Sequence, residues 1–169
     1  MRFYNQQHKF YCGIDLHARK MYVCILDQQG KTKVHQNLAT DPELLFEIIF
    51  PFIEDVVICV ECMFSWYWIA DFCAEHKIPF VLGHALYMKA IHGGKTKNDK
   101  IDSYKIAKLL KGGTLPMAYP YPAKMRATRD LLRRRTYMVR QCGLLVAHIL
   151  NTNIQYNLPP FNKKLSRKF

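Results

Sequence analysis

The sequence predicts an α/β domain with a mixed sheet, built in the order β-β-β-α-β-α-β-α and followed by one long helix. Three β-prone runs follow one another within residues 9–40. Two short apolar runs, 56–61 and 78–82, then alternate with helical patterns. A helical pattern without an internal proline extends from 123 to 153. Since half of the 169 residues are apolar, the chain can bury the core of one full domain and still carry an extension.

The first strands are three runs of high β propensity at residues 9–18, 21–30 and 31–40. Their short separations, with a turn at Gly30, predict an antiparallel meander. A helix follows, because Thr40-Asp41-Pro42-Glu43 combines a capping Thr or Asp with a proline in the first turn. Pro51 is expected to disturb the end of this helix.

The rest of the domain alternates between strands and helices. VVICVE at 56–61 and the apolar run at 78–82 are typical of buried strands. Helical patterns occupy 64–76 and 99–110, and residues 84–92 are helical or irregular. Three antiparallel strands followed by alternating α/β units are what an RNase H-like sheet requires.

Four regions follow from these patterns: a domain at 1–111, a Gly/Pro linker at 112–122, an Arg-rich helix at 123–158 and a basic tail at 159–169. The long helix carries a heptad seam of mediocre quality, made of Leu131, Arg135, Met138, Cys142, Leu145, Ile149 and Thr152.

Charge is divided unevenly along the chain. Residues 1–83 carry 7 Lys/Arg against 10 Asp/Glu, a net charge of −3, whereas residues 84–169 carry 18 against 3, a net charge of +15. This asymmetry favours a polyanionic partner, with nucleic acid first and an anionic membrane surface second. The expected nucleic-acid-binding residues are Lys95, Lys97, Lys100, Arg126, Arg129, Arg133, Arg134, Arg135 and Arg140.

The sequence indicates a cytoplasmic protein. Residues 1–9 are polar and basic, unlike a secretory signal, and the six cysteines do not form a disulfide framework. The longest apolar stretch, 56–70, is interrupted by Glu61 and is too short for a membrane span.

Two carboxylates lie in predicted strands. Asp15 interrupts the apolar run CGIDLHA, and Glu61 ends VVICVE. In a β-β-β-α-β topology the first and fourth strands are neighbours, so these side chains could face each other. Carboxylates at that range repel, and a divalent cation such as Mg²⁺ or Mn²⁺ resolves the conflict. Asp15 could instead be a turn residue, and Glu61 could cap the next helix.

Asp99 and Asp102 extend this hypothesis. On a helix at 100° per residue they share an arc of roughly 100° with the apolar positions Ile106, Leu109 and Leu110. The helix lysines, Lys97, Lys100, Lys105, Lys108 and Lys111, lie on the other side. Both aspartates would then point toward the sheet, although an N-cap and a dipole partner are an alternative explanation.

Competing motifs are weaker. Gly94-Lys95-Thr96 is like the end of a phosphate-binding loop, but Lys89 stands where that motif needs its first glycine. Cys59-x-x-Cys62 lacks a second ligand pair for zinc, so buried reduced thiols are expected. The histidines are dispersed and show no ligand spacing. The aromatic residues 64–68 could stack on bases, but a core role is favoured.

Three motifs resemble the DEDD transposases, insertion-sequence recombinases related to the Piv invertase, whose amino-terminal domain is RuvC-like. They are GIDLHARK around Asp15, VVICVECMFSWYW around Glu61, and KTKNDKIDSYKIAKLL around Asp99 and Asp102. The resemblance covers roughly residues 10–155. It implies that the four acidic residues are catalytic and bind Mg²⁺, that DNA is the substrate, and that the long helix is an oligomerising coiled coil. It further implies guidance by a structured RNA, as in many members.

Relatives continue into a domain with a nucleophilic serine, whereas this sequence ends at Phe169. We therefore expect a fragment or a truncated relative that is incomplete for recombination. Two hypotheses remain: a metal-dependent transposase catalytic domain, or a non-catalytic module that binds DNA or guide RNA.

Overall fold

The computed structural model describes residues 2–92, 98–161 and 165. The chain divides into two compact units, 1–120 and 121–169. The predicted Gly94-Lys95-Thr96 stretch, with Lys95, and the predicted binding residue Lys97 lie outside the described residues.

The first unit is built on one five-stranded sheet in the order β3-β2-β1-β4-β5. Its strands are β1 (Phe10–Leu16), β2 (Lys20–Asp27), β3 (Thr32–Ala39), β4 (Val56–Glu61) and β5 (Phe80–Gly83). The first three strands pair antiparallel, while β4 runs parallel to both β1 and β5. The predicted meander and the predicted adjacency of the first and fourth strands are confirmed.

Helices connect and cover the strands. They are α1 (Pro42–Ile49), a short 3₁₀ helix η1 (Phe50–Phe52), α2 (Tyr67–Glu75), α3 (Ala85–His92) and α4 (Asp99–Lys111). Asp41 caps α1, because its Oδ1 accepts a hydrogen bond of 2.8 Å from the Glu43 amide. Pro51 lies in η1, where the α-helical geometry has already ended.

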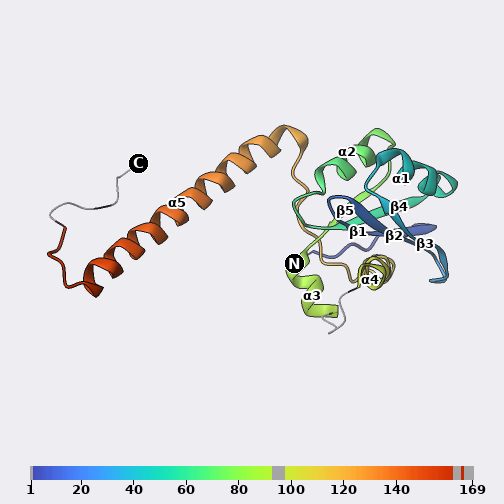
Figure 1. The fold of residues 1–169 in the computed structure, drawn as a ribbon. Helices are drawn as coiled ribbons and strands as arrows, with labels where there is room; N and C mark the ends of the chain where they lie inside the picture. The colour runs from blue at the N-terminus through green and yellow to red at the C-terminus, as the bar shows by residue number, and fades with distance from the viewer. Residues whose placement is uncertain (1, 93–97, 162–164, 166–169) are drawn as a thin grey trace. The chain divides into compact units, whose positions relative to one another are not determined.

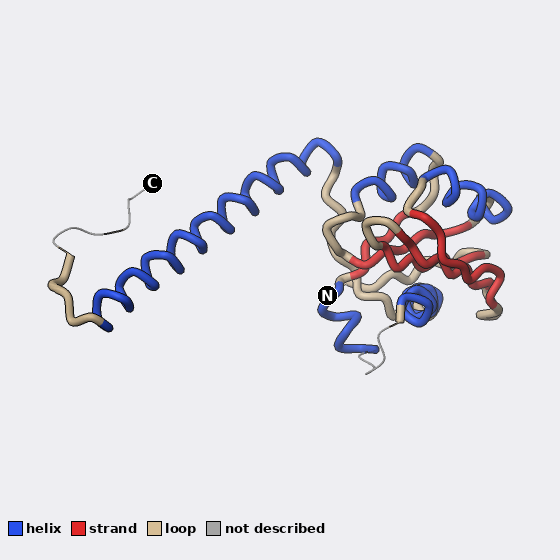
Figure 2. The backbone as a smooth tube through the Cα atoms, viewed as in Figure 1, coloured by secondary structure: helices blue, strands red, loops and turns tan. Residues whose placement is uncertain are grey.

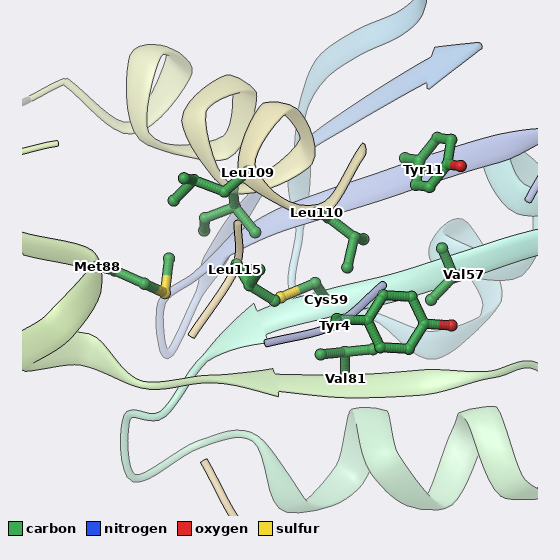
Figure 3. Close-up of a cluster of buried hydrophobic side chains, with 10 residues drawn as sticks. Tyr4, Tyr11, Val57, Cys59, Val81, Met88, Leu109, Leu110 and Leu115 are labelled. Carbon is green, nitrogen blue, oxygen red and sulfur yellow. The ribbon is translucent and has the colours of Figure 1, made fainter. Parts of the chain in front are cut away.

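The helices lie on both faces of the sheet (Figures 1 and 2). Helices α1 and α2 cover one face, and α4 crosses the other. The core on the α4 face is shown in Figure 3, where strand residues meet the apolar side of α4. Leu109 and Leu110 of α4 are at most 3% exposed, so each contributes about 2 kcal/mol through burial. This packing fixes α4 against the strands that carry Asp15 and Glu61.

The first residues of the chain close the unit. The Tyr4 amide donates to the Leu115 carbonyl at 3.2 Å, and the Met117 amide donates to the Arg2 carbonyl at 2.9 Å. Tyr4 and Leu115 are both buried in the core on the α4 face. Leu115, within the segment predicted as a linker, is therefore a core residue of the first unit.

The second unit contains α5 (Ala123–Gln155), a helix of 33 residues. None of its residues is buried. Large apolar side chains remain exposed along it, including Leu131, Met138, Leu144, Leu145, Ile149 and Ile154. None of the described helices is long and apolar enough to cross a membrane.

Candidate metal centre

Helix α4 approaches β1 unusually closely at Gly13. A Cβ atom at Gly13 would lie 2.5 Å from the Ser103 carbonyl oxygen and closer still to the Ala107 amide nitrogen. Only glycine therefore allows the helix backbone to rest on this strand. Because strand side chains alternate, Asp15 lies on the same face two residues further along. The close approach thus brings the start of α4 toward Asp15.

The first turn of α4 is held by side chains other than its aspartates. Asn98 is the N-cap, and its Oδ1 accepts a hydrogen bond of 3.0 Å from the Lys100 amide. His35 of β3 donates from Nε2 to the Lys100 carbonyl at 2.8 Å, and the buried Ser103 hydroxyl donates to the same carbonyl at 3.0 Å. The interpretation of Asp99 as the N-cap is therefore wrong, and its carboxylate is not needed for capping.

The His17 side chain lies close to the carboxylates of both Asp15 and Asp99. The His17 Nε2 lies 3.4 Å from Asp15 Oδ2 and 3.5 Å from Asp99 Oδ1. One ligand atom from each of these residues lies within 4.8 Å of the other two, and no other such group occurs within 2–92, 98–161 and 165. The described structure thus joins strand β1 and helix α4 at one potential metal site.

The environment of Asp15 disfavours its charge. Burial raises the pKa of the Asp15 carboxyl, and the nearby charges of Asp99 and Asp102 raise it further, whereas His17 lowers it. Asp15 lies within β1, opposite Tyr22 of β2, so the interpretation of Asp15 as a turn residue is wrong. A carboxylate whose charge is disfavoured in this way is typical of a functional position.

Glu61 lies beside Asp15 in the sheet register but outside the three-residue group. Ile14 of β1 pairs with Val60 of β4, so Asp15 and Glu61 are the next residues on two adjacent parallel strands. Both lie on the α4 face by strand alternation. The N-cap position of α2 is Trp66, so Glu61 does not occupy the capping position that was its alternative role.

Asp102 follows one turn after Asp99 and is half-buried. Its Oδ1 lies 3.4 Å from Lys105 Nζ. The expectation that Lys105 points away from the aspartates is therefore wrong, because its long side chain reaches back along the helix. The predicted apolar side of α4 is confirmed: Ile106, Leu109 and Leu110 are buried.

His17 is the residue that the sequence interpretation missed. The dispersed histidines gave no ligand spacing when considered with one another. The informative spacing was Asp15-x-His17, because residues two apart at a strand end project to the same side. Spacing between histidines was the wrong criterion here, because the potential site combines one histidine with two carboxylates.

The buried thiols of Cys24 and Cys59 are unsuited to thiolate chemistry. Cys59 is fully buried, and its burial raises its thiol pKa well above the ordinary value. Burial likewise raises the pKa of Cys24 to about 11. Zinc binding and redox chemistry both need a thiolate, so these residues are structural. Trp66 is also buried in the core, whereas Phe64 is 81% exposed.

The described basic residues expected to bind nucleic acid divide into two kinds. Lys100 is exposed at the start of α4, as are four arginines of α5, Arg133, Arg134, Arg135 and Arg140. Arg126 instead donates from Nε to the Tyr121 carbonyl at 3.1 Å. Arg129 pairs with Asp130 at 3.1 Å and lies over the Tyr121 ring. The exposed arginines are the ones available to phosphate groups.

Comparison with known proteins agrees with the motifs. Similar solved structures include the Thermus thermophilus RuvC structure, at 15% identity over 64% of this chain and 99% of that chain, with a TM-score of 0.44. They also include T. thermophilus RuvC in complex with a Holliday junction substrate, at 16% identity over 66% of this chain and 100% of that chain, with a TM-score of 0.44. No curated protein matches the chain. The profile of the IS110 DEDD transposases, described as a transposase, matches residues 12–153. Since this match spans most of the sequence, the chain belongs to the IS110 family of DEDD transposases.

Proposed function

We propose that this chain is the metal-dependent catalytic domain of the transposase and acts on DNA phosphodiesters through Asp15, Glu61, Asp99 and Asp102. The observation that carries the proposal is the proximity of Asp15 and Asp99, which come from two elements far apart in sequence and have carboxylate oxygens within 4.8 Å of each other. Family membership supplies the reaction class, since a transposase breaks and joins DNA strands.

The donor set fits a divalent cation. Carboxylate oxygens are the ligands that Mg²⁺ and Mn²⁺ prefer, and partly buried carboxylates that repel one another gain from a shared cation. Asp15, Glu61, Asp99 and Asp102 would hold it, and a bound ion would stabilise charge on the phosphodiester oxygens. The protein contributes orientation: Gly13 sets the height of α4, and Asn98 and His35 fix its first turn.

Metal-dependent unfolding tests this proposal. Millimolar Mg²⁺ or Mn²⁺ should raise the thermal midpoint of the wild-type protein. Asp15→Asn should stabilise the metal-free protein by about 1 kcal/mol, because it removes repulsion, and should abolish the metal response. Glu43→Gln, an exposed carboxylate on α1, is the matched control and should respond like wild type.

An equal response to metal in all three proteins would contradict the site. Metal-dependent nicking of DNA, lost in Asp102→Asn, then separates catalysis from binding. If wild-type protein binds DNA but neither binds metal nor nicks, the non-catalytic binding module is the better explanation.

We further propose that the exposed face of α5 binds the phosphate backbone of DNA, or of a structured guide RNA. Arg133, Arg134, Arg135 and Arg140 are all exposed on this helix. They support the positively charged second half of the sequence as a nucleic-acid-binding surface. The guide RNA is implied by the family resemblance.

Salt dependence tests the exposed arginines of α5. Replacing Arg133, Arg134 and Arg135 by Gln should flatten the plot of log K against log salt, by about 0.9 for each phosphate group of duplex DNA that is no longer neutralised. The control is a triple variant of the first unit that also removes three positive charges, with Lys9, Lys20 and Lys31 replaced by Gln. It should leave the slope nearly unchanged. A slope that changes equally in both triple variants would contradict a specific role for α5.

The exposed seam of α5 supports self-association as a homo-oligomer. The bacterial cytoplasm is the proposed location, because DNA is there and the six cysteines are all free thiols.

A further inference from the structure

We propose that His17 is a metal ligand and that it makes the centre prefer a divalent transition-metal ion over Mg²⁺. The proposal rests on the proposed function, because it concerns the same centre. The carboxylates alone form an all-oxygen site, and His17 adds one imidazole nitrogen to it.

The distances around His17 agree with those expected of ligands that share one ion. Ligands bound to one ion at about 2.1 Å lie about 3.0 Å apart when adjacent and about 4.2 Å apart when opposite. The His17 Nε2 lies 3.4 Å from one carboxylate oxygen and 3.5 Å from the other, within that range. The three ligand atoms of Asp15, His17 and Asp99 all lie within 4.8 Å of one another, as the ligands of one ion do.

The same protein contains a histidine–carboxylate hydrogen bond for comparison. His8 Nδ1 lies 2.7 Å from Asp55 Oδ1, which is the length of a charge-assisted hydrogen bond. The His17 distances are longer by 0.7 and 0.8 Å. His17 therefore does not form a tight hydrogen bond to either carboxylate.

The backbone holds His17 in place. The His17 amide donates to the Lys20 carbonyl at 2.9 Å, and the His17 carbonyl accepts from the Thr40 hydroxyl at 2.9 Å. These hydrogen bonds fix the backbone of His17 beside the end of β1, so that its side chain starts from a defined position near the carboxylates. The His17 side chain is 44% exposed, which leaves an ion a path from solvent.

An imidazole ligand changes which ion is preferred. Mg²⁺ binds oxygen ligands and seldom accepts nitrogen, whereas imidazole is a good ligand for transition-metal ions. Among sites with equal carboxylates, the one with an added imidazole should therefore bind Mn²⁺ or Co²⁺ more tightly relative to Mg²⁺.

Calorimetric titration of the full chain with Mg²⁺, Mn²⁺ and Co²⁺ tests the inference. His17→Ala should weaken binding of Mn²⁺ and Co²⁺ at least tenfold and change the Mg²⁺ affinity less than threefold. The visible spectrum of bound Co²⁺ should also change when the nitrogen ligand is removed. His148→Ala, an exposed histidine of α5, is the control and should match wild type.

Other outcomes would overturn the inference. If His17 only neutralises the carboxylates, His17→Ala should strengthen binding of all three ions, Mg²⁺ included. An equal loss for all three would indicate a positioning role, and unchanged affinities with an unchanged Co²⁺ spectrum would exclude ligation. If wild-type protein binds none of the three ions, the proposed metal centre itself fails, which is distinct from failure of the His17 assignment.

Discussion

Asp55 joins the first residues of the chain to the sheet through a short series of hydrogen bonds. His8 donates from Nδ1 to Asp55 Oδ1, its Nε2 lies 2.6 Å from the Tyr4 hydroxyl, and the Lys9 amide donates to Asp55 Oδ2 at 2.9 Å. The hydrogen bond from His8 holds the pKa of Asp55 below its ordinary value, and Lys9 lowers it further. Burial raises the pKa of Tyr4 to about 12, so its hydroxyl stays protonated.

This lowered pKa predicts a pH-dependent stability. Asp55→Ala should reduce the free energy of unfolding at pH 7 by about 1 kcal/mol, a value discounted for the partly exposed carboxylate. The stabilisation is present above the unfolded-state pKa near 4 and is lost as the pH falls through the lower folded-state value. Urea denaturation from pH 7 to pH 3 should therefore show the two proteins converging.

Glu54→Ala is the control for this experiment. Glu54 is the neighbouring carboxylate, but it forms only an exposed ion pair with Lys9 at 3.2 Å. Such pairs contribute little, so the variant should match wild type at every pH. A gap between wild type and Asp55→Ala that stays constant down to pH 3 would contradict the role of the ionised carboxylate.

At the residue scale, the site could be predicted only in part. Asp15 was conspicuous because a carboxylate in an apolar strand is costly, and Asp99 because helical periodicity turned it toward the sheet. His17 was not conspicuous in the sequence, because its importance depends on how closely α4 approaches β1. The catalytic roles of all four acidic residues stay predictions.

At the scale of elements, Gly13 controls how α4 sits on the sheet. Gly13→Ala should destabilise the protein by roughly 2–3 kcal/mol, because its methyl group meets helix backbone rather than a movable side chain. It should also weaken the metal response, because α4 would have to shift away from Asp15. Guanidinium denaturation and metal titration of the same variant check both effects.

Gly143→Ala provides the opposite case. Gly143 lies in α5 with nothing within 4 Å of an added Cβ, so alanine should raise the helix content by favouring the helix by about 1 kcal/mol. Circular dichroism measures this change.

The prediction for Gly13 would be contradicted by a Gly13→Ala variant with wild-type stability, which would show that α4 does not depend on the close approach.

The elements themselves were largely predictable. Apolar, β-branched runs gave the buried strands, and Asp41 with Pro42 marked the start of α1. The start of α2 was placed at Phe64 but lies at Tyr67, and Phe64 is exposed before it. Local pattern could not locate that boundary, since the aromatic residues on either side of it are equally apolar.

At the scale of the whole molecule, α5 carries apolar side chains that nothing else described in its own unit covers. Leu131, Met138, Leu145 and Ile149 lie within roughly 40° of one another around the helix. A helix this long with an apolar stripe gains stability by pairing with another helix. We therefore expect association that depends on protein concentration.

Leu145→Asp should shift the oligomer to monomer, as measured by light scattering coupled to gel filtration. Leu144→Asp is the matched control, because it makes the same change one residue earlier, about 100° round the helix and away from the seam. Leu144 and Leu145 are similarly exposed, so helix propensity and solubility change alike. Equal dissociation by both substitutions would contradict a specific seam.

The pairing of the first residues with residues 115–117 sets an order of events during synthesis. Tyr4 is made first, but its partner Leu115 is translated only after the whole sheet and α4. The nascent domain therefore cannot complete its core until that segment has left the ribosome, by which time α5 is being synthesised. The unit with the carboxylates can thus finish folding before α5 presents its apolar stripe to another copy.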